Sequence, residues 1–359
     1  MSRSKEELQA VISNFQIDGE IVDVGTWGSG HIHETYASKI RTKNGEIHYI
    51  HQWINHHVFK DPVKVMQNIE RVTKFARDRI NANGGDPLRE TLTLVPTQEG
   101  QLYYQASNGE YWRTYIFIEG ARTYDQINNL QHVYNAAKAF GNFQRLLKEF
   151  NRDELHETIP NFHHTPKRYE TFLEAIKKDS HNRVQEVKEE IDFLIQREAD
   201  MHLVVEMLEN GAMPIRVTHN DTKLNNVMID DQTGEGICVI DLDTVMPGSA
   251  LYDFGDCVRL GASTAAEDEI NLDIVRFDVQ KFAQLAGGFL EPTRDFLTPA
   301  EIKYLAFSAK LMTLEEAVRF LTDYLSGDVY FRIHRPKHNL DRARNQIKMV
   351  AEIDRKSVV

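Results

Sequence analysis

The chain has very few cysteines, no long apolar run and no excess of positive charge. Its 359 residues include only Cys238 and Cys257, too few for a disulfide framework and too irregular for a zinc site, which predicts a reducing, cytoplasmic environment. No apolar run approaches the length of a membrane span, and the first residues lack the apolar stretch of a secretion signal. The formal net charge of -12 argues against general binding to nucleic acid or to anionic membranes.

The pattern of apolar residues changes near residue 120. Before it, a first amphipathic helix and a helix starting near Asp61 accompany strand-like runs at 20–25, 34–40, 47–53, 92–96, 102–106 and 111–119. From Ile127 the period is helical, and further helices are predicted at 168–179, 183–209, 273–287, 298–325 and 338–355. These patterns predict an α+β fold of two lobes, a β-rich one over residues 1–120 and a larger helical one over residues 121–359.

One hairpin interrupts the helical region and follows a polar loop. The loop His219–Asn226 precedes strands predicted at 226–230 and 236–241, so the end of the hairpin returns to its beginning. Asp221 can accept a hydrogen bond from an acceptor hydroxyl, and Lys223 can reach a transferred phosphoryl group. Asn226 and Asp241 can supply oxygen ligands to Mg²⁺, a hard cation. These residues predict phosphoryl transfer from ATP.

The spacing of this loop is also that of the protein-kinase catalytic loop. The sequence H-R-D-L-x-x-x-N has its His, Asp and Asn at the offsets of His219, Asp221 and Asn226. We assign no proton transfer to His219, because a histidine in such a loop usually braces the backbone. The later segment Asp253-Phe254-Gly255 looks like the kinase D-F-G motif, but it lies beyond the hairpin and after Pro247-Gly248, where a helix is predicted to begin. It is therefore interpreted as a helix cap or as a carboxylate that braces the catalytic loop from behind.

The nucleotide is expected to bind at the β-rich lobe. Gly28, Ser29 and Gly30 lie between two predicted strands, where backbone N–H groups can approach phosphates. The linker from Phe117 to Glu119 offers backbone groups to adenine.

The third predicted strand departs from the kinase pattern. It carries no lysine for the α- and β-phosphates, and Gln52 stands in that place. Glutamine donates a hydrogen bond but brings no charge. Either another cation such as Lys223 takes over, or the chain binds nucleotide only modestly.

Several segments resemble the N-acetylhexosamine 1-kinases, a family within the aminoglycoside-phosphotransferase-like kinases. The resemblance runs almost from end to end and rests on residues 28–32, 162–166, 218–226, 240–244, 246–248, 319–321 and 323–325. It implies a bilobal protein-kinase-like fold and transfer of the ATP γ-phosphoryl group to the anomeric hydroxyl of N-acetylglucosamine or N-acetylgalactosamine. By position, Asp221 is then the base, and Asn226 and Asp241 are the Mg²⁺ ligands.

The same resemblance implies sugar contacts, each of which has a structural alternative. His31 could contact the sugar or cap the phosphate turn. Arg319 could do so or form a surface ion pair with Glu315 on one helix. Tyr330 could recognise the sugar or simply pack. Asp243 could hold a sugar hydroxyl or assist the metal.

Two other functions remain open from the sequence. One is a kinase for another hydroxyl compound, of the aminoglycoside, choline or homoserine type. Cationic aminoglycosides call for a densely acidic pocket, whereas residues 319–337 are mixed or basic. The other is a nucleotide-binding pseudokinase that serves as a scaffold. The sequence predicts neither the oligomeric state nor the preference between the two sugars.

Overall fold

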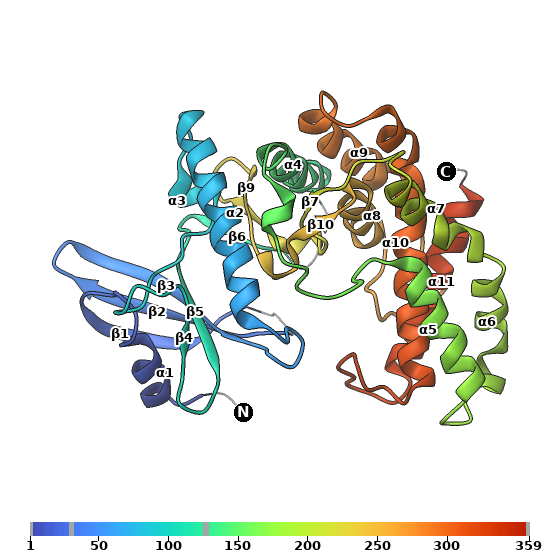
Figure 1. The fold of residues 1–359 in the computed structure, drawn as a ribbon, viewed down its shortest axis with the longest axis horizontal. Coiled ribbons are helices and arrows are strands. Elements are labelled where there is room, and N and C mark those ends of the chain that lie inside the picture. Colours follow the sequence, from blue (N-terminus) through green and yellow to red (C-terminus); the bar gives the residue numbers. More distant parts are fainter. Residues whose placement is uncertain (1–2, 29–31, 125–128, 357–359) are drawn as a thin grey trace.

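The computed structural model describes residues 3–28, 32–124 and 129–356, which form two lobes side by side (Figure 1). The smaller lobe, coloured blue to cyan, is built on an antiparallel sheet, and the larger lobe, green to red, is mostly helical. This arrangement confirms the α+β, two-lobed fold that the sequence predicts. In the described part of the chain, none of the helices combines the length and the apolar composition that a membrane crossing requires.

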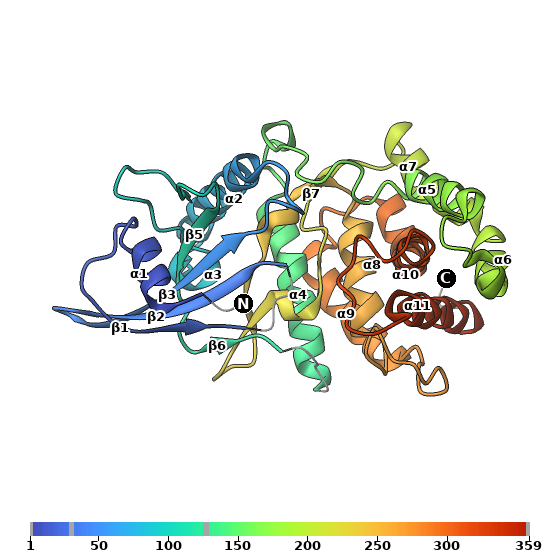
Figure 2. The same cartoon turned by 90° about the horizontal axis from the view of Figure 1, so that it is seen from below.

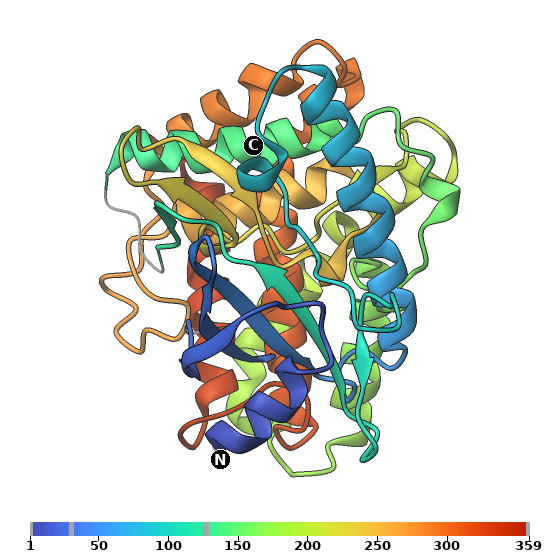
Figure 3. The same cartoon turned by 90° about the vertical axis from the view of Figure 1, so that its left-hand side faces the viewer.

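The smaller lobe contains a five-stranded sheet in the order β1-β2-β3-β5-β4 (Figure 3). Its strands are β1 (Glu20–Thr26), β2 (Glu34–Thr42), β3 (Gly45–Ile54), β4 (Tyr104–Gln105) and β5 (Tyr111–Ile116). All neighbouring strands are antiparallel, and the register of β3 and β5 sets Gln52 opposite Arg113. Side chains that are directly opposite each other lie on the same face of a sheet, so these two can interact.

The helices of the smaller lobe begin at clear capping residues. They are α1 (Lys5–Ile12), α2 (Pro62–Ala82) and α3 (Pro87–Glu90). Ser4 and Glu7 form a capping box at α1, and Asp61 caps α2, whose first residue is Pro62. The strand predicted at 92–96 does not form. Only Leu94 makes an isolated bridge, to Tyr115, because Pro96 follows and cannot donate to a ladder.

The larger lobe consists of eight described α-helices. They are α4 (Leu130–Leu146), α5 (Thr165–Lys178), α6 (Lys188–Ile195), α7 (Glu198–Glu209), α8 (Ala250–Gly261), α9 (Val279–Thr293), α10 (Pro299–Leu325) and α11 (His338–Arg355). Figure 2 shows α10 and α11 side by side and nearly end on. The helix predicted over 183–209 is broken, because α6 packs against α11 whereas α7 packs against α5 and α10. The helix predicted from 273 begins only at Val279, where Asp278 caps it.

Two small β elements carry the polar loop between them. One sheet has the order β6-β8-β9 and contains β6 (Ala121–Arg122), β8 (Val227–Asp230) and β9 (Gly236–Val239). The second pairs β7 (Arg216–Thr218) with β10 (Met246–Gly248). The hairpin β8–β9 confirms the predicted one, whereas β6, β7 and β10 were not predicted. The lobe boundary at residue 120 stays a prediction; β6, just after it, pairs with the hairpin of the larger lobe.

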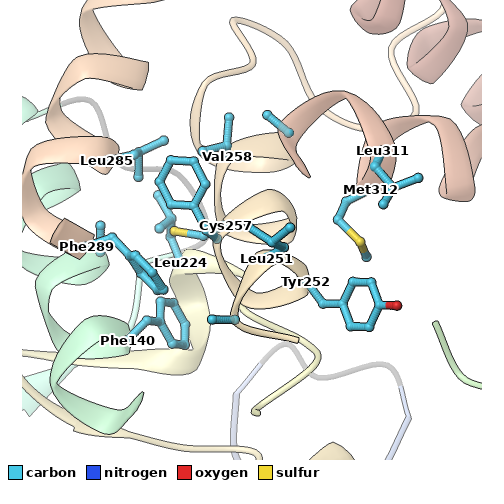
Figure 4. Close-up of a cluster of buried hydrophobic side chains, with 14 of the residues drawn as sticks. Phe140, Leu224, Leu251, Tyr252, Cys257, Val258, Leu285, Phe289, Leu311 and Met312 are labelled. Atoms are coloured by element: carbon cyan, nitrogen blue, oxygen red, sulfur yellow. The ribbon is translucent and has the colours of Figure 1, made fainter. Parts of the chain in front are cut away.

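The core of the larger lobe anchors the polar loop. Leu224, which lies in that loop, enters a buried cluster with Phe140 of α4, Val258 of α8, and Leu285 and Phe289 of α9 (Figure 4). Burial of a leucine side chain contributes roughly 2 kcal/mol. The loop is therefore fixed to the core at a point between its polar residues.

Candidate active site

A cleft of about 820 Å³ lies between the lobes and is lined by residues of both. Five of the predicted site residues line it: Gly28, Asp221, Lys223, Arg319 and Tyr330. Six others are not among its lining residues: Gln52, Phe117, Glu119, Asn226, Asp241 and Asp243. Ser29, Gly30 and His31 lie outside the described residues.

Asp221 and Lys223 form an ion pair at the cleft. Lys223 Nζ lies 3.0 Å from Asp221 Oδ2, and both side chains are partly exposed. Burial alone would raise the pKa of Asp221, but the charges of Lys223 and His219 outweigh it and lower that pKa. An ionised carboxylate beside a cation can accept a hydroxyl proton while the cation faces a phosphoryl group.

Asn226 and Asp241 lie at the two ends of the hairpin. The backbone N–H of Ile240 donates to the carbonyl of Asn226 at 2.9 Å, which brings the two ends together. Asn226 Nδ2 donates to the Asp221 carbonyl at 2.8 Å and to its carboxylate at 3.2 Å, so the amide oxygen points away from Asp221. Burial, followed by the nearby carboxylates of Asp243 and Asp221, raises the pKa of Asp241. A carboxylate crowded in this way and a neighbouring amide oxygen fit a hard divalent cation such as Mg²⁺.

His219 braces the loop, as the sequence predicts. Its Nε2 donates to the carbonyl of Ile240 at 2.9 Å, and its Nδ1 accepts from the backbone N–H of Asp221 at 3.3 Å. The ring is fully buried against the edges of Phe140 and Phe143. Both ring nitrogens are therefore engaged with backbone groups, which agrees with the absence of a proton-transfer role.

The segment Asp253-Phe254-Gly255 belongs to α8 and supports the loop from behind. Asp253 is fully buried, and its carboxylate accepts from the backbone N–H groups of His219 at 3.0 Å and Asn220 at 2.8 Å. Gly255 lets α8 approach α10 closely, since an added Cβ would lie 2.3 Å from a backbone oxygen of α10. This geometry confirms the bracing interpretation and rejects a metal-binding D-F-G motif.

A second carboxylate of α8 extends this support. Asp256 accepts from the backbone N–H of Thr222 at 2.8 Å, and the Thr222 hydroxyl donates to the carbonyl of Asp253 at 2.5 Å. Three backbone N–H groups of the loop, those of His219, Asn220 and Thr222, are thus satisfied by one helix, while the side chain of Asp221 faces the cleft.

A buried ion pair joins the two lobes just after the hairpin β8–β9. Arg113 of β5 donates through both terminal nitrogens to the two oxygens of Asp243, at 2.7 and 2.6 Å. The Arg113 Nε donates to Gln52 Oε1 at 2.9 Å. Burial would raise the pKa of Asp243, but the charge of Arg113 outweighs it and holds that pKa well below its usual value. β3 therefore lacks the kinase lysine, but the neighbouring strand β5 carries Arg113 directly opposite Gln52.

The predicted nucleotide residues lie at the edge of the sheet. Gly28 has a φ of 74°, which favours glycine. Trp27 packs edge-on against Phe117, with ring centroids 5.3 Å apart. His48 Nδ1 lies 2.5 Å from a carboxylate oxygen of Glu119. Phe117 thus contacts the glycine turn, whereas the Glu119 side chain is engaged by β3.

Arg319 is buried at the cleft rather than on the surface. Its side chain is 10% exposed, pairs with Glu316, and lies 3.8 Å from Glu315. The guanidinium also lies over the rings of Phe162 and Phe331, at 5.3 and 5.4 Å. The helix ion pair with Glu315 is thus present, but it is buried and not on the surface as predicted. A fixed, buried guanidinium at a cleft is suited to hydrogen bonding with a polar ligand.

Tyr330 stands at the exposed rim of the same wall. Its side chain lines the cleft and is largely exposed, 57% by area. Its backbone N–H donates to Asp323 at 2.8 Å, as do those of Val329 and Phe331 at 2.9 Å. Asp323 therefore fixes the backbone of this turn while the tyrosine ring remains accessible.

The sequence missed one buried polar link to the loop. His163 lies within 3.0 Å of Glu315 through Nδ1 and donates through Nε2 to the carbonyl of Asn220 at 2.9 Å. It thereby connects α10, which carries Arg319, with the residue before Asp221. The resemblance marked residues 162–166, but no local pattern reveals the linking role of His163, because its partners lie 57 and 152 residues away. Arg113 had a signal, a charge inside an apolar strand.

Solved structures of known function share this fold over nearly their whole length. The chain aligns with spectinomycin phosphotransferase APH(9)-Ia in complex with ADP and spectinomycin (15% identity, 98% of this chain and 97% of that chain, TM-score 0.59). It aligns similarly with an aminoglycoside phosphotransferase from Alicyclobacillus acidocaldarius (14%, 98% and 96%, TM-score 0.62). A third example is choline kinase from Cryptosporidium parvum Iowa II (14%, 99% and 98%, TM-score 0.57). At these identities the likeness establishes the fold, which confirms the predicted kinase-like class.

The family itself is identified from the sequence match. The model described as "Phosphotransferase enzyme family" (APH) matches residues 86–287, a span that begins at α3 and ends within α9. This span includes the loop His219–Asn226, the hairpin and the bracing helix α8. Because the match covers more than half of the chain, this protein belongs to the APH phosphotransferase family, whose members transfer phosphoryl groups to hydroxyl acceptors.

Proposed function

We propose that this phosphotransferase uses ATP and Mg²⁺ to phosphorylate the anomeric hydroxyl of N-acetylglucosamine or N-acetylgalactosamine. The observation that carries this proposal is the shared cleft: the Asp221–Lys223 pair lines the same cavity as Arg319 and Tyr330. The sequence resemblance to N-acetylhexosamine 1-kinases assigns the first pair to chemistry and the second to the sugar.

The reaction needs one base and one oriented acceptor. In the proposed step the anomeric oxygen forms a bond to the γ-phosphorus, the bond from that phosphorus to the bridging oxygen breaks, and ADP leaves. The hydroxyl proton passes to the carboxylate of Asp221, which is sufficient because an anomeric hydroxyl is more acidic than an ordinary alcohol. In this proposal Lys223 faces the transferred phosphoryl group. The backbone N–H groups of Gly28, Ser29 and Gly30 bind the phosphates of ATP.

The proposed metal ligands are Asn226 and Asp241. When bound there, Mg²⁺ would neutralise charge on the phosphates of ATP. The backbone of the 117–119 linker is proposed to bind adenine. Gln52 is directed elsewhere, because its amide bonds to Arg113 and Thr35 within the sheet.

The charges of the cleft support a neutral acceptor. Among the described residues that line it, every acidic side chain is within ion-pair distance of a cation: Glu34 with Arg3, Asp221 with Lys223, Asp256 and Glu267 with Arg259, and Glu316 with Arg319. A cationic aminoglycoside or choline would have to compete with these pairs. An uncharged sugar would not, and its hydroxyl and amide groups can bond to Arg319.

The test is a panel of acceptors with product identification. ADP formation is measured with N-acetylhexosamines, unmodified hexoses, aminoglycosides and choline, with and without Mg²⁺, and the product is examined by phosphorus NMR. We expect turnover with the N-acetylhexosamines and phosphate on C1. Phosphate on another carbon would refute the anomeric assignment, and ATP binding without any turnover would favour the pseudokinase.

A further inference from the structure

Arg113 is a charged residue in the middle of an aromatic strand. Its side chain is 1% exposed and lies on the face of the sheet shared with Gln52. All three of its nitrogens are used: the terminal pair by Asp243 and Nε by Gln52. Desolvating an arginine is costly, so a buried one requires a partner whose position it determines in turn.

Gln52 orients this arginine and does little else. Its Oε1 accepts from Arg113 at 2.9 Å, and its Nε2 donates to the Thr35 hydroxyl at 3.1 Å. Both ends of the amide are therefore committed within the sheet. Gln52 stands where protein kinases have a lysine, but it bonds to Arg113 on the neighbouring strand and not to a phosphate.

The third neighbour of Asp243 is His33. The His33 Nδ1 accepts from the backbone N–H of Asn55 at 3.1 Å, so the neutral ring carries its proton on Nε2. That nitrogen lies 3.5 Å from Asp243 Oδ1. His33, Asp241 and Asp243 have atoms within 4.8 Å of one another, as a metal site would. However, a protonated Nε2 cannot bind a metal, and both oxygens of Asp243 already hold a guanidinium.

Asp243 is in turn coupled to the neighbouring acid by a short, strained turn. Asp241 has a φ of 61°, in the left-handed region, and residues Leu242–Thr244 form one 3-10 turn after it. The carbonyl of Asp243 is held by the Thr158 hydroxyl at 3.0 Å, and α2 holds the carbonyl of Val245 through Asn68 at 3.0 Å. In such a turn, the direction of the Asp241 carboxylate depends on where the Asp243 side chain is anchored.

We propose that Arg113, oriented by Gln52, is a positioning residue that grips Asp243 and thereby aims Asp241 at the metal of the nucleotide complex. This ion pair connects the two lobes, so the sheet of the smaller lobe sets the position of Asp241 and Asp243 in the larger lobe. Asp243 is then neither a sugar contact nor a metal ligand. The proposal rests on the proposed use of Mg²⁺ and a nucleotide, but not on the identity of the acceptor.

The test measures metal-dependent ADP binding in the full-length protein without any acceptor. In Arg113→Lys the charge remains but the two-pronged grip is lost. We expect the Mg²⁺ concentration that half-saturates the metal-dependent enhancement of ADP binding, measured by calorimetry, to rise about tenfold. ADP binding without metal should change less than twofold. Mn²⁺ binding to the ADP complex, followed by electron paramagnetic resonance, should weaken in parallel.

Arg216→Lys is the matched control. Arg216 also makes a two-pronged pair with a fully buried carboxylate, at 2.5 and 2.8 Å, but that carboxylate belongs to Glu301 in the first turn of α10 and not to the turn after Asp241. It should lose thermal stability comparably and retain the wild-type Mg²⁺ dependence. Gln52→Leu, which removes only the bond to Nε, should raise the half-saturating Mg²⁺ by about threefold, less than Arg113→Lys.

A double variant separates positioning from stability. In Arg113→Met/Asp243→Leu the ion pair is replaced by apolar groups, which often restores stability. We expect a stable protein that still needs more Mg²⁺. Wild-type Mg²⁺ dependence in this variant or in Arg113→Lys would overturn the proposal. If the unaltered protein bound ADP without any effect of Mg²⁺ or Mn²⁺, the proposed function would fail instead, whereas a wrong acceptor would leave all these results unchanged.

Discussion

The two walls of the cleft are held in place by different interactions. The loop that carries Asp221 is fixed through its backbone, because Asp253 and Asp256 of one helix accept its N–H groups. On the wall that carries Arg319 and Tyr330, Arg319 is held by a side-chain ion pair, and Tyr330 lies on an exposed turn whose backbone N–H groups donate to Asp323. Backbone bonds leave the loop side chains little freedom, whereas side-chain pairs can be exchanged without disturbing the chain. We therefore expect the first wall to serve the proposed chemistry and the second to serve the proposed recognition of the acceptor.

The largest effect should come from the base. Asp221→Asn keeps the shape of the side chain but cannot accept the hydroxyl proton. We expect kcat to fall by about 10²–10⁴-fold, the usual contribution of general base catalysis. ADP binding, measured by calorimetry, should stay within about twofold. Near-normal turnover would remove Asp221 from the proposed mechanism.

The backbone support behind the loop should matter for stability as well as for rate. In Asp253→Asn, the side chain has one carbonyl oxygen for the two buried N–H groups of His219 and Asn220. Its NH₂ group then faces the N–H group that is left without an acceptor. We expect the free energy of unfolding to fall by about 1–3 kcal/mol, with a lower kcat in the folded protein. Denaturant titration provides the measurement. Asp278→Asn, at the partly exposed cap of α9, is the control and should lose less; equal losses would contradict the bracing role.

Changes in the wall that carries Arg319 should alter the KM for the sugar and not ADP binding. Arg319→Lys keeps the charge next to Glu316 but loses the planar guanidinium. We expect the KM for the N-acetylhexosamine to rise about tenfold, equivalent to about 1.4 kcal/mol. The KM for ATP should change little. A change in ATP affinity with an unchanged sugar KM would show that this wall serves the nucleotide.

The smallest effect is expected at the rim. Tyr330→Phe removes a hydroxyl from an exposed ring and leaves the bonds of the turn to Asp323 intact. We expect the sugar KM to rise by about threefold or less, since a single exposed hydrogen bond contributes little. Steady-state kinetics would detect this. A loss as large as that of Arg319→Lys would mean that the rim, and not the buried guanidinium, dominates recognition.

Local spacing was sufficient to predict the polar loop and the hairpin that follows it. The offsets of His219, Asp221 and Asn226 marked the loop, and the hairpin after it returned Asp241 to the same place because its turn is short. The bracing role of Asp253 also followed from its place in the chain. The surroundings of Arg319 were less predictable. Helical spacing suggested an exposed ion pair with Glu315, whereas α10 is buried around nearly its whole circumference.

The amino-acid sequence by itself determined the two-lobed order of the main strands and helices, the loop His219–Asn226 and the family, because these depend on residues close together in the chain. Only the tertiary structure decided that Arg113 meets Asp243, 130 residues away, and that His163 joins α10 to the loop. Such contacts arise when separate elements pack and their buried charges must find partners. No local period encodes that choice.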